Sequence, residues 1–119
     1  MLDWNDYRRQ LKSATGELNR LSPGTIQGYQ GLATAHKEGG RLDAKTRELM
    51  AIAVAVALRC DGCIAVHTDA AIRHGAAKEE IAEALNVAIT ISAGAALVYS
   101  NRVLDAYAVH PSNQPPAAD

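Results

Sequence analysis

The sequence lacks the features that mark several large classes of protein. It has 119 residues with no phenylalanine, only 4% aromatic residues and a net charge of −1. Such a balanced charge provides no basic surface for nucleic acid or for an anionic membrane. Because aromatic residues are scarce, Ala, Val, Ile and Leu must build the core, and these favour closely packed helices over a sheet. We expect one all-α domain, with no nucleic-acid or membrane partner.

Signals for export and for membrane insertion are also missing. Residues 1–9 contain no basic segment followed by an apolar run. The longest apolar run, Leu49 to Leu58, has about ten residues, whereas a spanning helix needs roughly 20. We therefore predict a cytoplasmic protein. In a reducing compartment, the two cysteines of this chain are more typical of redox or metal chemistry than of a structural crosslink.

The spacing of apolar residues predicts a single-domain bundle of about six helices and no strands. Ser22-Pro23 and Asp43 are typical of helix starts, and Gly75 of a helix end. We expect Gly94 to interrupt the helical pattern near the C-terminus. The expected helices cover residues 4–20, 23–38, 44–59, 60–74, 78–93 and 95–108. Residues 1–108 then form the helical domain, and residues 109–119 form a disordered tail.

The helix expected at residues 44–59 is apolar on every side between Leu49 and Leu58. A helix with no polar face is buried all round. A chain of this length has difficulty surrounding such a helix alone, so we expect it to form an oligomer.

The segment from Cys60 to His67 contains the candidate reactive groups. Cys60 and Cys63 are three residues apart and His67 follows four residues later, so their side chains share one stripe of a helix. One helical turn brings two cysteines within reach of a disulfide, and the start of a helix favours a thiolate. His67 is then placed to accept the proton of Cys63, directly or through one water. Gly62 has no side chain, and we expect it to give a substrate close access to the sulfurs.

Glu48 is the fourth candidate, because a carboxylate in an apolar helix is costly without a partner. If the helices that carry Glu48 and His67 are antiparallel neighbours, the carboxylate faces the imidazole and orients it as a base. The alternative is an ion pair between Glu48 and Lys45 or Arg59.

Two other interpretations of the cysteines stay open. Cys60, Cys63 and His67 are three ligands of a zinc site, for which Glu48 or His74 is the only plausible fourth. The cysteines are otherwise small buried hydrophobic residues without a chemical role. We expect no metal, haem or flavin to be required.

With these residues the chain resembles the carboxymuconolactone decarboxylase superfamily, specifically its alkylhydroperoxidase D-like branch. The matching pattern is Glu48, the segment Cys60-Asp61-Gly62-Cys63 and His67, with further likeness in the surrounding residues from about 22 to 108. The resemblance implies that residues 1–108 form an alkylhydroperoxidase D-like helical domain. It also implies assembly into homotrimers or, for short single-domain members, homohexamers with the active site beside a subunit interface.

The activity that the resemblance implies is thiol-dependent reduction of a hydroperoxide, or electron transfer to a peroxiredoxin partner. Cys60 and Cys63 correspond to the redox-active disulfide, and Glu48 and His67 to the proton relay. The best-studied members carry a histidine directly before the second cysteine, where this chain has Gly62, so its relay is shorter.

Our leading hypothesis is an antioxidant oxidoreductase. Cys63 attacks a hydroperoxide, Cys60 closes the disulfide, and an external dithiol or a peroxiredoxin exchanges with it. One alternative is a decarboxylase-like enzyme acting on a small lactone, with His67 and Glu48 as acid and base. Another is a non-catalytic, redox-sensing oligomer.

Overall fold

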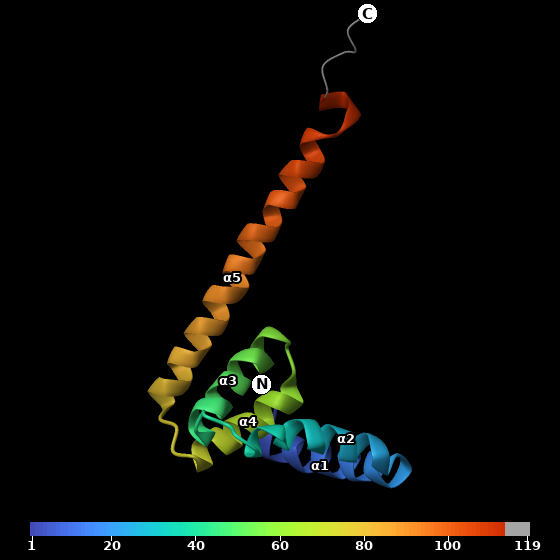
Figure 1. Cartoon of the computed structure of the whole chain (residues 1–119), viewed down its shortest axis with the longest axis vertical. Helices are drawn as coiled ribbons and strands as arrows, with labels where there is room; N and C mark the ends of the chain where they lie inside the picture. The colour runs from blue at the N-terminus through green and yellow to red at the C-terminus, as the bar shows by residue number, and fades with distance from the viewer. Residues whose placement is uncertain (114–119) are drawn as a thin grey trace, which may run out of the picture.

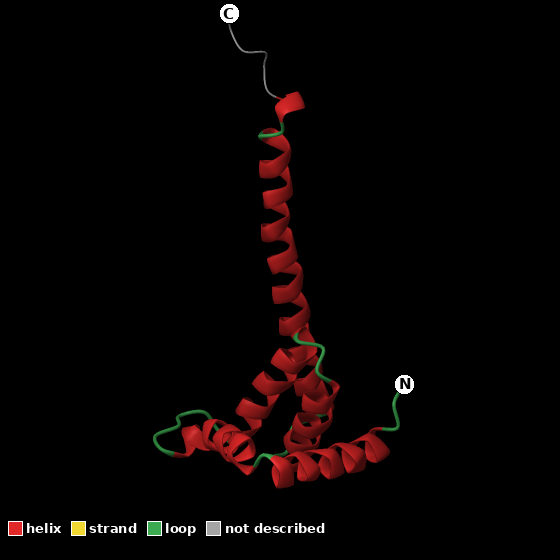
Figure 2. Cartoon of the chain, turned by 90° about the vertical axis from the view of Figure 1, so that its right-hand side faces the viewer, coloured by secondary structure: helices red, strands yellow, loops and turns green. Residues whose placement is uncertain are grey.

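The computed structural model describes residues 1–113, and this part of the chain consists only of helices and loops (Figure 2). The prediction of an all-α, single-domain fold is therefore confirmed. The elements follow one another as α1 (Trp4–Leu21), α2 (Pro23–Thr34), the 3-10 turn η1 (Ala35–Lys37), α3 (Ala44–Ala57), α4 (Asp61–Arg73), α5 (Lys78–Ala108) and the 3-10 turn η2 (Pro111–Asn113).

Local capping explains where the first helices begin. The Asp3 carboxylate accepts hydrogen bonds from two backbone amides at the start of α1. Asp43 caps α3 by accepting one backbone hydrogen bond, from the Thr46 amide to Oδ1 at 2.7 Å. Pro23 is the first residue of α2, a position where a backbone N–H would have no acceptor within the helix. The predicted starts at Trp4, Pro23 and Ala44 are confirmed.

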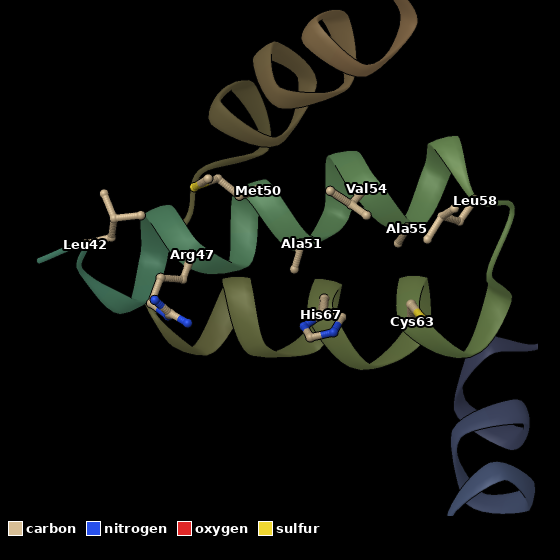
Figure 3. Close-up of a pocket in the computed structure, with 9 residues that line it drawn as sticks. All are labelled: Leu42, Arg47, Met50, Ala51, Val54, Ala55, Leu58, Cys63 and His67. Carbon is tan, nitrogen blue, oxygen red and sulfur yellow. The ribbon is translucent and has the colours of Figure 1, made fainter. Parts of the chain in front are cut away.

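The turn between α3 and α4 is a Schellman motif centred on a residue other than glycine. Arg59 has φ 55°, in the left-handed region that L-residues seldom adopt. Its amide donates to the Val56 carbonyl at 3.1 Å, and the Cys60 amide donates to the Ala55 carbonyl at 3.0 Å. The chain thus reverses within three residues, and α3 and α4 pack as antiparallel neighbours (Figure 3). Gly75, with φ 82°, has the same place after α4, as predicted.

The core among the described residues is small and rich in alanine. The buried side chains are those of Ile52 and Ala55 on α3, Ala65 and Ala71 on α4, and Ala88 on α5. Short side chains let α3 pack closely against both α4 and α5. The pair α1 and α2 packs against the α4 side of this unit (Figure 1).

The final helix differs from the sequence-based expectation. α5 is one continuous helix of 31 residues, so the predicted break at Gly94 is wrong and the described chain has five α-helices rather than about six. A glycine inside a helix costs about 1 kcal/mol relative to alanine, which the helical residues on both sides offset. The first part of α5 packs on α3, and the rest projects away from the other helices (Figures 1 and 2).

This projection leaves much apolar surface uncovered in the isolated chain. The radius of gyration is 21.5 Å, whereas a compact chain of this length has roughly 13–14 Å. On α3, Met50, Val54 and Leu58 are more than half exposed, although the sequence predicted burial all round. Apolar side chains on α5 are similarly exposed: Val87, Ile89, Ile91, Leu97, Val98, Tyr99, Val103, Leu104 and Tyr107.

Within the described residues, α5 is also the one helix long and apolar enough to cross a membrane by length and composition. The count of uninterrupted apolar residues did not identify it, because isolated polar residues divide its sequence. A helix that is apolar all round is buried either in lipid or in protein. The sequence predicted a disordered tail at residues 109–119. Its first part contains the turn η2, and residues 114–119 lie outside the described residues.

Candidate active site

Cys60 and Cys63 form a disulfide at the N-terminus of α4, with their Cα atoms 5.3 Å apart. Cys60 is the N-cap residue, and its Sγ accepts a hydrogen bond from the Cys63 amide at 3.2 Å. The backbone N–H of Cys60 also closes the turn after α3. Both sulfurs therefore lie where unpaired amides and the helix dipole stabilise a thiolate once the disulfide is reduced.

Glu48 and His67 meet across the interface between α3 and α4. Glu48 Oε2 lies 2.7 Å from His67 Nδ1, and the two side chains are 22% and 31% exposed. The structure thus brings together the two residues that the sequence placed on facing helices. The alternative partner Lys45 instead donates to Glu80 Oε1 at 2.8 Å.

This contact determines which nitrogen of the imidazole is free to act. A carboxylate only accepts hydrogen bonds, so Nδ1 of His67 carries the donated proton. In the neutral ring, Nε2 then has the free lone pair that accepts a proton. Cys63 lies one turn before His67 on α4, and both side chains face the same cavity (Figure 3).

That cavity has a volume of about 360 Å³ and lies beside α3 and α4 (Figure 3). Its wall is predominantly apolar, with Arg47 near one end and Cys63 near the other. The exposed apolar side chains of α3 form much of this wall. The lining residues are Leu42, Arg47, Met50, Ala51, Val54, Ala55, Leu58, Cys63 and His67.

A second cavity, of about 850 Å³, lies between α4 and the α1–α2 pair. Cys60, Cys63 and His67 all line it, so Cys63 and His67 are accessible from two sides and Cys60 from one. Gly62 lines it as well, as expected of a residue that opens access to the sulfurs. A Cβ at this position would lie 3.3 Å from Leu11 Cδ2 on α1, so α1 packs closely against the start of α4 here.

An ion pair that the sequence analysis missed connects α3 to α5. Lys45 and Glu80 are separated by 35 positions in the chain, so no local spacing indicates their contact. The hydrogen bond from Lys45, with a second from the Ala77 amide, holds the pKa of the Glu80 carboxyl below its usual value. In turn, Glu80 raises the pKa of Lys45.

The zinc alternative finds no complete ligand set here. Among residues 1–113, no group of three His, Cys, Asp or Glu side chains is arranged to hold a metal ion. His74, one of the two possible fourth ligands, is the C-cap of α4, at the opposite end of the helix from Cys60. At 1.5 Å per residue these helix ends lie roughly 20 Å apart, so His74 does not join the group.

Comparison with known proteins places most of the chain within one family. The family model "Carboxymuconolactone decarboxylase family" matches residues 23–106. A crystal structure of an apo carboxymuconolactone decarboxylase family protein from Legionella pneumophila matches with a TM-score of 0.71 and 32% identity. The match covers 87% of this chain and 93% of the other.

Two sequence relatives are similar over most of their length. An uncharacterized protein from Haemophilus influenzae is 49% identical over 107 residues, which are 90% of this chain and 95% of the relative. A protein named "Uncharacterized protein 4 in cox locus" from Paracoccus denitrificans is 37% identical over 95 residues, or 80% of this chain and 86% of the relative.

Proposed function

Because this chain belongs to the carboxymuconolactone decarboxylase family, we propose that it is a thiol-dependent peroxidase of the alkylhydroperoxidase D-like branch. One observation carries the proposal. The Cys60–Cys63 disulfide lies at the start of α4, and His67, paired with Glu48 of α3, lies one turn beyond Cys63 on the same helix. A reactive sulfur, a resolving sulfur and an oriented base are the groups that this chemistry needs.

The cycle begins with both cysteines reduced. His67 Nε2 accepts the proton of Cys63, and the Glu48 carboxylate stabilises the imidazolium that forms. The Cys63 thiolate attacks the terminal oxygen of the hydroperoxide, and the O–O bond breaks. The alkoxide that leaves accepts the proton from His67 and becomes an alcohol, while Cys63 is oxidised to a sulfenic acid.

The second half of the cycle restores the thiols. The Cys60 thiol loses its proton as its sulfur attacks Cys63, an S–S bond forms, and the hydroxide that leaves takes up that proton and becomes water. An external dithiol then reduces the disulfide by exchange and becomes a disulfide itself. Alternatively, the reduced cysteines pass their electrons to a peroxiredoxin. Two sulfurs carry both electrons, so the reaction requires no metal, haem or flavin.

Cys63 is the better candidate for the attacking sulfur. It lines both cavities together with His67, whereas Cys60 lines only the larger one.

We place this peroxidase in the cytoplasm as a homohexamer or homotrimer. The apolar faces of α3 and α5 support assembly, because exposed apolar surface of this extent marks a protein interface. In such an assembly α5 is covered by protein rather than by lipid.

A steady-state assay with cumene hydroperoxide and dithiothreitol tests the activity. We expect turnover by the natural chain and loss of at least 100-fold in the double variant Cys60→Ser/Cys63→Ser. Dimedone trapping assigns the sulfurs, because Cys60→Ser leaves a Cys63 sulfenic acid with no resolving partner. If Cys63→Ser forms a sulfenic acid at the full rate, Cys60 is the attacking residue.

A decarboxylase-like use of the fold predicts a different result. Glu48 and His67 would then act as acid and base on a lactone, and the double cysteine variant would keep its activity. Dependence of turnover on both cysteines argues against that alternative.

A further inference from the structure

The larger cavity beside the disulfide has one wall made by a single face of α1. Arg8 and Lys12, like Leu11 and Thr15, are four residues apart, which puts them on one side of the helix, and all four line the cavity. Cys60, at the N-cap of α4, and Cys63 and His67 of α4 line the same cavity. The face of α1 and the sulfurs therefore share one cavity.

The charged residues of this cavity leave an excess of positive charge. Arg73 is paired with Asp69, four residues before it, at 3.0 Å. Arg8 donates a hydrogen bond to the neutral side chain of Asn5, and no carboxylate among residues 1–113 pairs with Arg8 or Lys12. Arg8 and Lys12 thus line a cavity whose one carboxylate, that of Asp69, is already paired with Arg73.

The rest of the wall is apolar and comes from three helices. Leu11 of α1, Ile26 and Tyr29 of α2, and Val66 of α4 line the cavity as well. The volume of about 850 Å³ falls within the range of small-molecule sites, roughly 300–1,000 Å³. By contrast, the smaller cavity carries a single cation, Arg47, among apolar residues.

We propose that this cavity selects hydroperoxides that carry a carboxylate on an apolar body. Arg8 and Lys12 bind the carboxylate, the apolar wall holds the body, and the O–O bond reaches Cys63. The inference rests on the peroxidase function proposed above and adds the substrate class. The carboxylate takes no part in the chemistry, so the product is the corresponding hydroxy acid, with water released when the disulfide closes.

Two hydroperoxides that differ only in the carboxylate test this selectivity. Para-carboxy cumene hydroperoxide and cumene hydroperoxide have the same apolar body and the same reacting group. For the natural chain we expect kcat/KM to be about tenfold higher for the carboxylated compound, mainly through a lower KM. High ionic strength should reduce this preference, because both cations are accessible to solvent.

Variants of α1 link the preference to the two cations. Arg8→Gln/Lys12→Gln should lower kcat/KM for the carboxylated compound to the value for cumene hydroperoxide and so abolish the tenfold preference. Arg9→Gln is the matched control on the same helix, since Arg9 does not line the cavity, and it should keep the preference. Arg8→Lys retains the positive charge and should keep most of the preference for the carboxylated hydroperoxide.

A second measurement detects carboxylate binding without peroxide turnover. Para-isopropylbenzoate, which has no peroxide group, should slow alkylation of the reduced cysteines by iodoacetamide, and isopropylbenzene should not. The protection should disappear in Arg8→Gln/Lys12→Gln. Protection without any peroxidase activity would support the carboxylate site and overturn the proposed function. Peroxidase activity with equal kcat/KM for both hydroperoxides and no protection would overturn the inference and leave the proposed function standing.

Discussion

Glu48 Oε2 and His67 Nδ1 lie 2.7 Å apart although 19 positions separate the two residues in the chain. The contact exists because the tight turn at Arg59 makes α3 and α4 antiparallel neighbours. It gives a carboxylate in an otherwise apolar helix a hydrogen-bonding partner, and it orients the imidazole one turn beyond Cys63.

Replacing Glu48 tests whether its charge matters for the reactivity of the cysteines. Glu48→Gln can still accept a hydrogen bond from His67 Nδ1 but no longer stabilises an imidazolium. A hydrogen bond to a charged group exceeds a neutral one by about 1–1.5 kcal/mol, which corresponds to roughly a tenfold loss. We expect that loss in the rate at which hydroperoxide oxidises the reduced protein, measured by stopped flow.

Glu83→Gln is the control for this experiment. Glu83 is an exposed carboxylate on α5 and does not line either cavity beside the disulfide. An unchanged rate in Glu48→Gln would mean that the hydrogen bond to His67 only offsets the cost of burying Glu48 and does not affect the reactivity of the cysteines.

Introducing a side chain at Gly62 tests the close approach of α1 to α4. A Cβ there would lie 3.3 Å from Leu11 Cδ2 and 3.9 Å from the Tyr7 hydroxyl. We expect Gly62→Ala to be nearly neutral, because the end of the Leu11 side chain can move by a few tenths of an ångström. Gly62→His, with a much larger side chain, should lower the free energy of unfolding by about 1–3 kcal/mol.

Urea unfolding of the two histidine variants measures this effect. Gly16→His is the matched control, because a Cβ at this helical glycine of α1 has no atom within 4 Å. Equal stability of Gly62→His and Gly16→His would contradict tight packing of α1 on α4. The stability of Gly62→His also measures how well this chain tolerates a histidine directly before Cys63, the position discussed in the sequence comparison above.

The Lys45–Glu80 pair predicts a pH-dependent contribution to stability. Hydrogen bonds lower the pKa of Glu80 from its usual 4.5, so the stabilisation is fully present above pH 4.5. It disappears as the pH falls through the lowered pKa of the folded state. Glu80→Gln should therefore unfold at a lower temperature than the natural chain at neutral pH, and the gap should narrow as the pH falls below 4.5 and through the lowered pKa of Glu80.

Thermal unfolding of both proteins across this pH range provides the measurement. The pair is exposed to solvent by about a third on each side, so the difference should also shrink at high salt. A gap that stays constant down to acidic pH would show that the contact contributes through packing instead of charge.

The apolar surface of α5 predicts the behaviour of the whole chain in solution. We expect a homohexamer or homotrimer by native mass spectrometry, soluble without detergent. Placing charges at two exposed apolar positions, Val98→Lys and Leu104→Lys, should lower the mass of the assembly by at least twofold. A monomeric natural chain, or one extracted only by detergent, would contradict the assembly that we propose.

Much of the fold was accessible from sequence because its signals are local. The capping residue Asp43, the Ser22-Pro23 pair and the terminating Gly75 each act within one helical turn, and the structure has helix ends at all three. Gly94 was misleading for the same reason. Its local preference opposes a helix, but 30 helical neighbours in α5 outweigh a cost of about 1 kcal/mol.

In the candidate site, too, features set by local spacing could be predicted from the sequence, and features set by packing between distant segments could not. Three- and four-residue spacing is enough to place Cys60, Cys63 and His67 on one stripe, and an unpartnered carboxylate is enough to indicate that Glu48 needs a neighbour. No spacing in the sequence indicates that α1 lines a cavity together with the sulfurs. The cavity beneath α1, the cations that line it and the contact between Lys45 and Glu80 arise from packing between distant segments, and only the folded chain decides which of these segments meet.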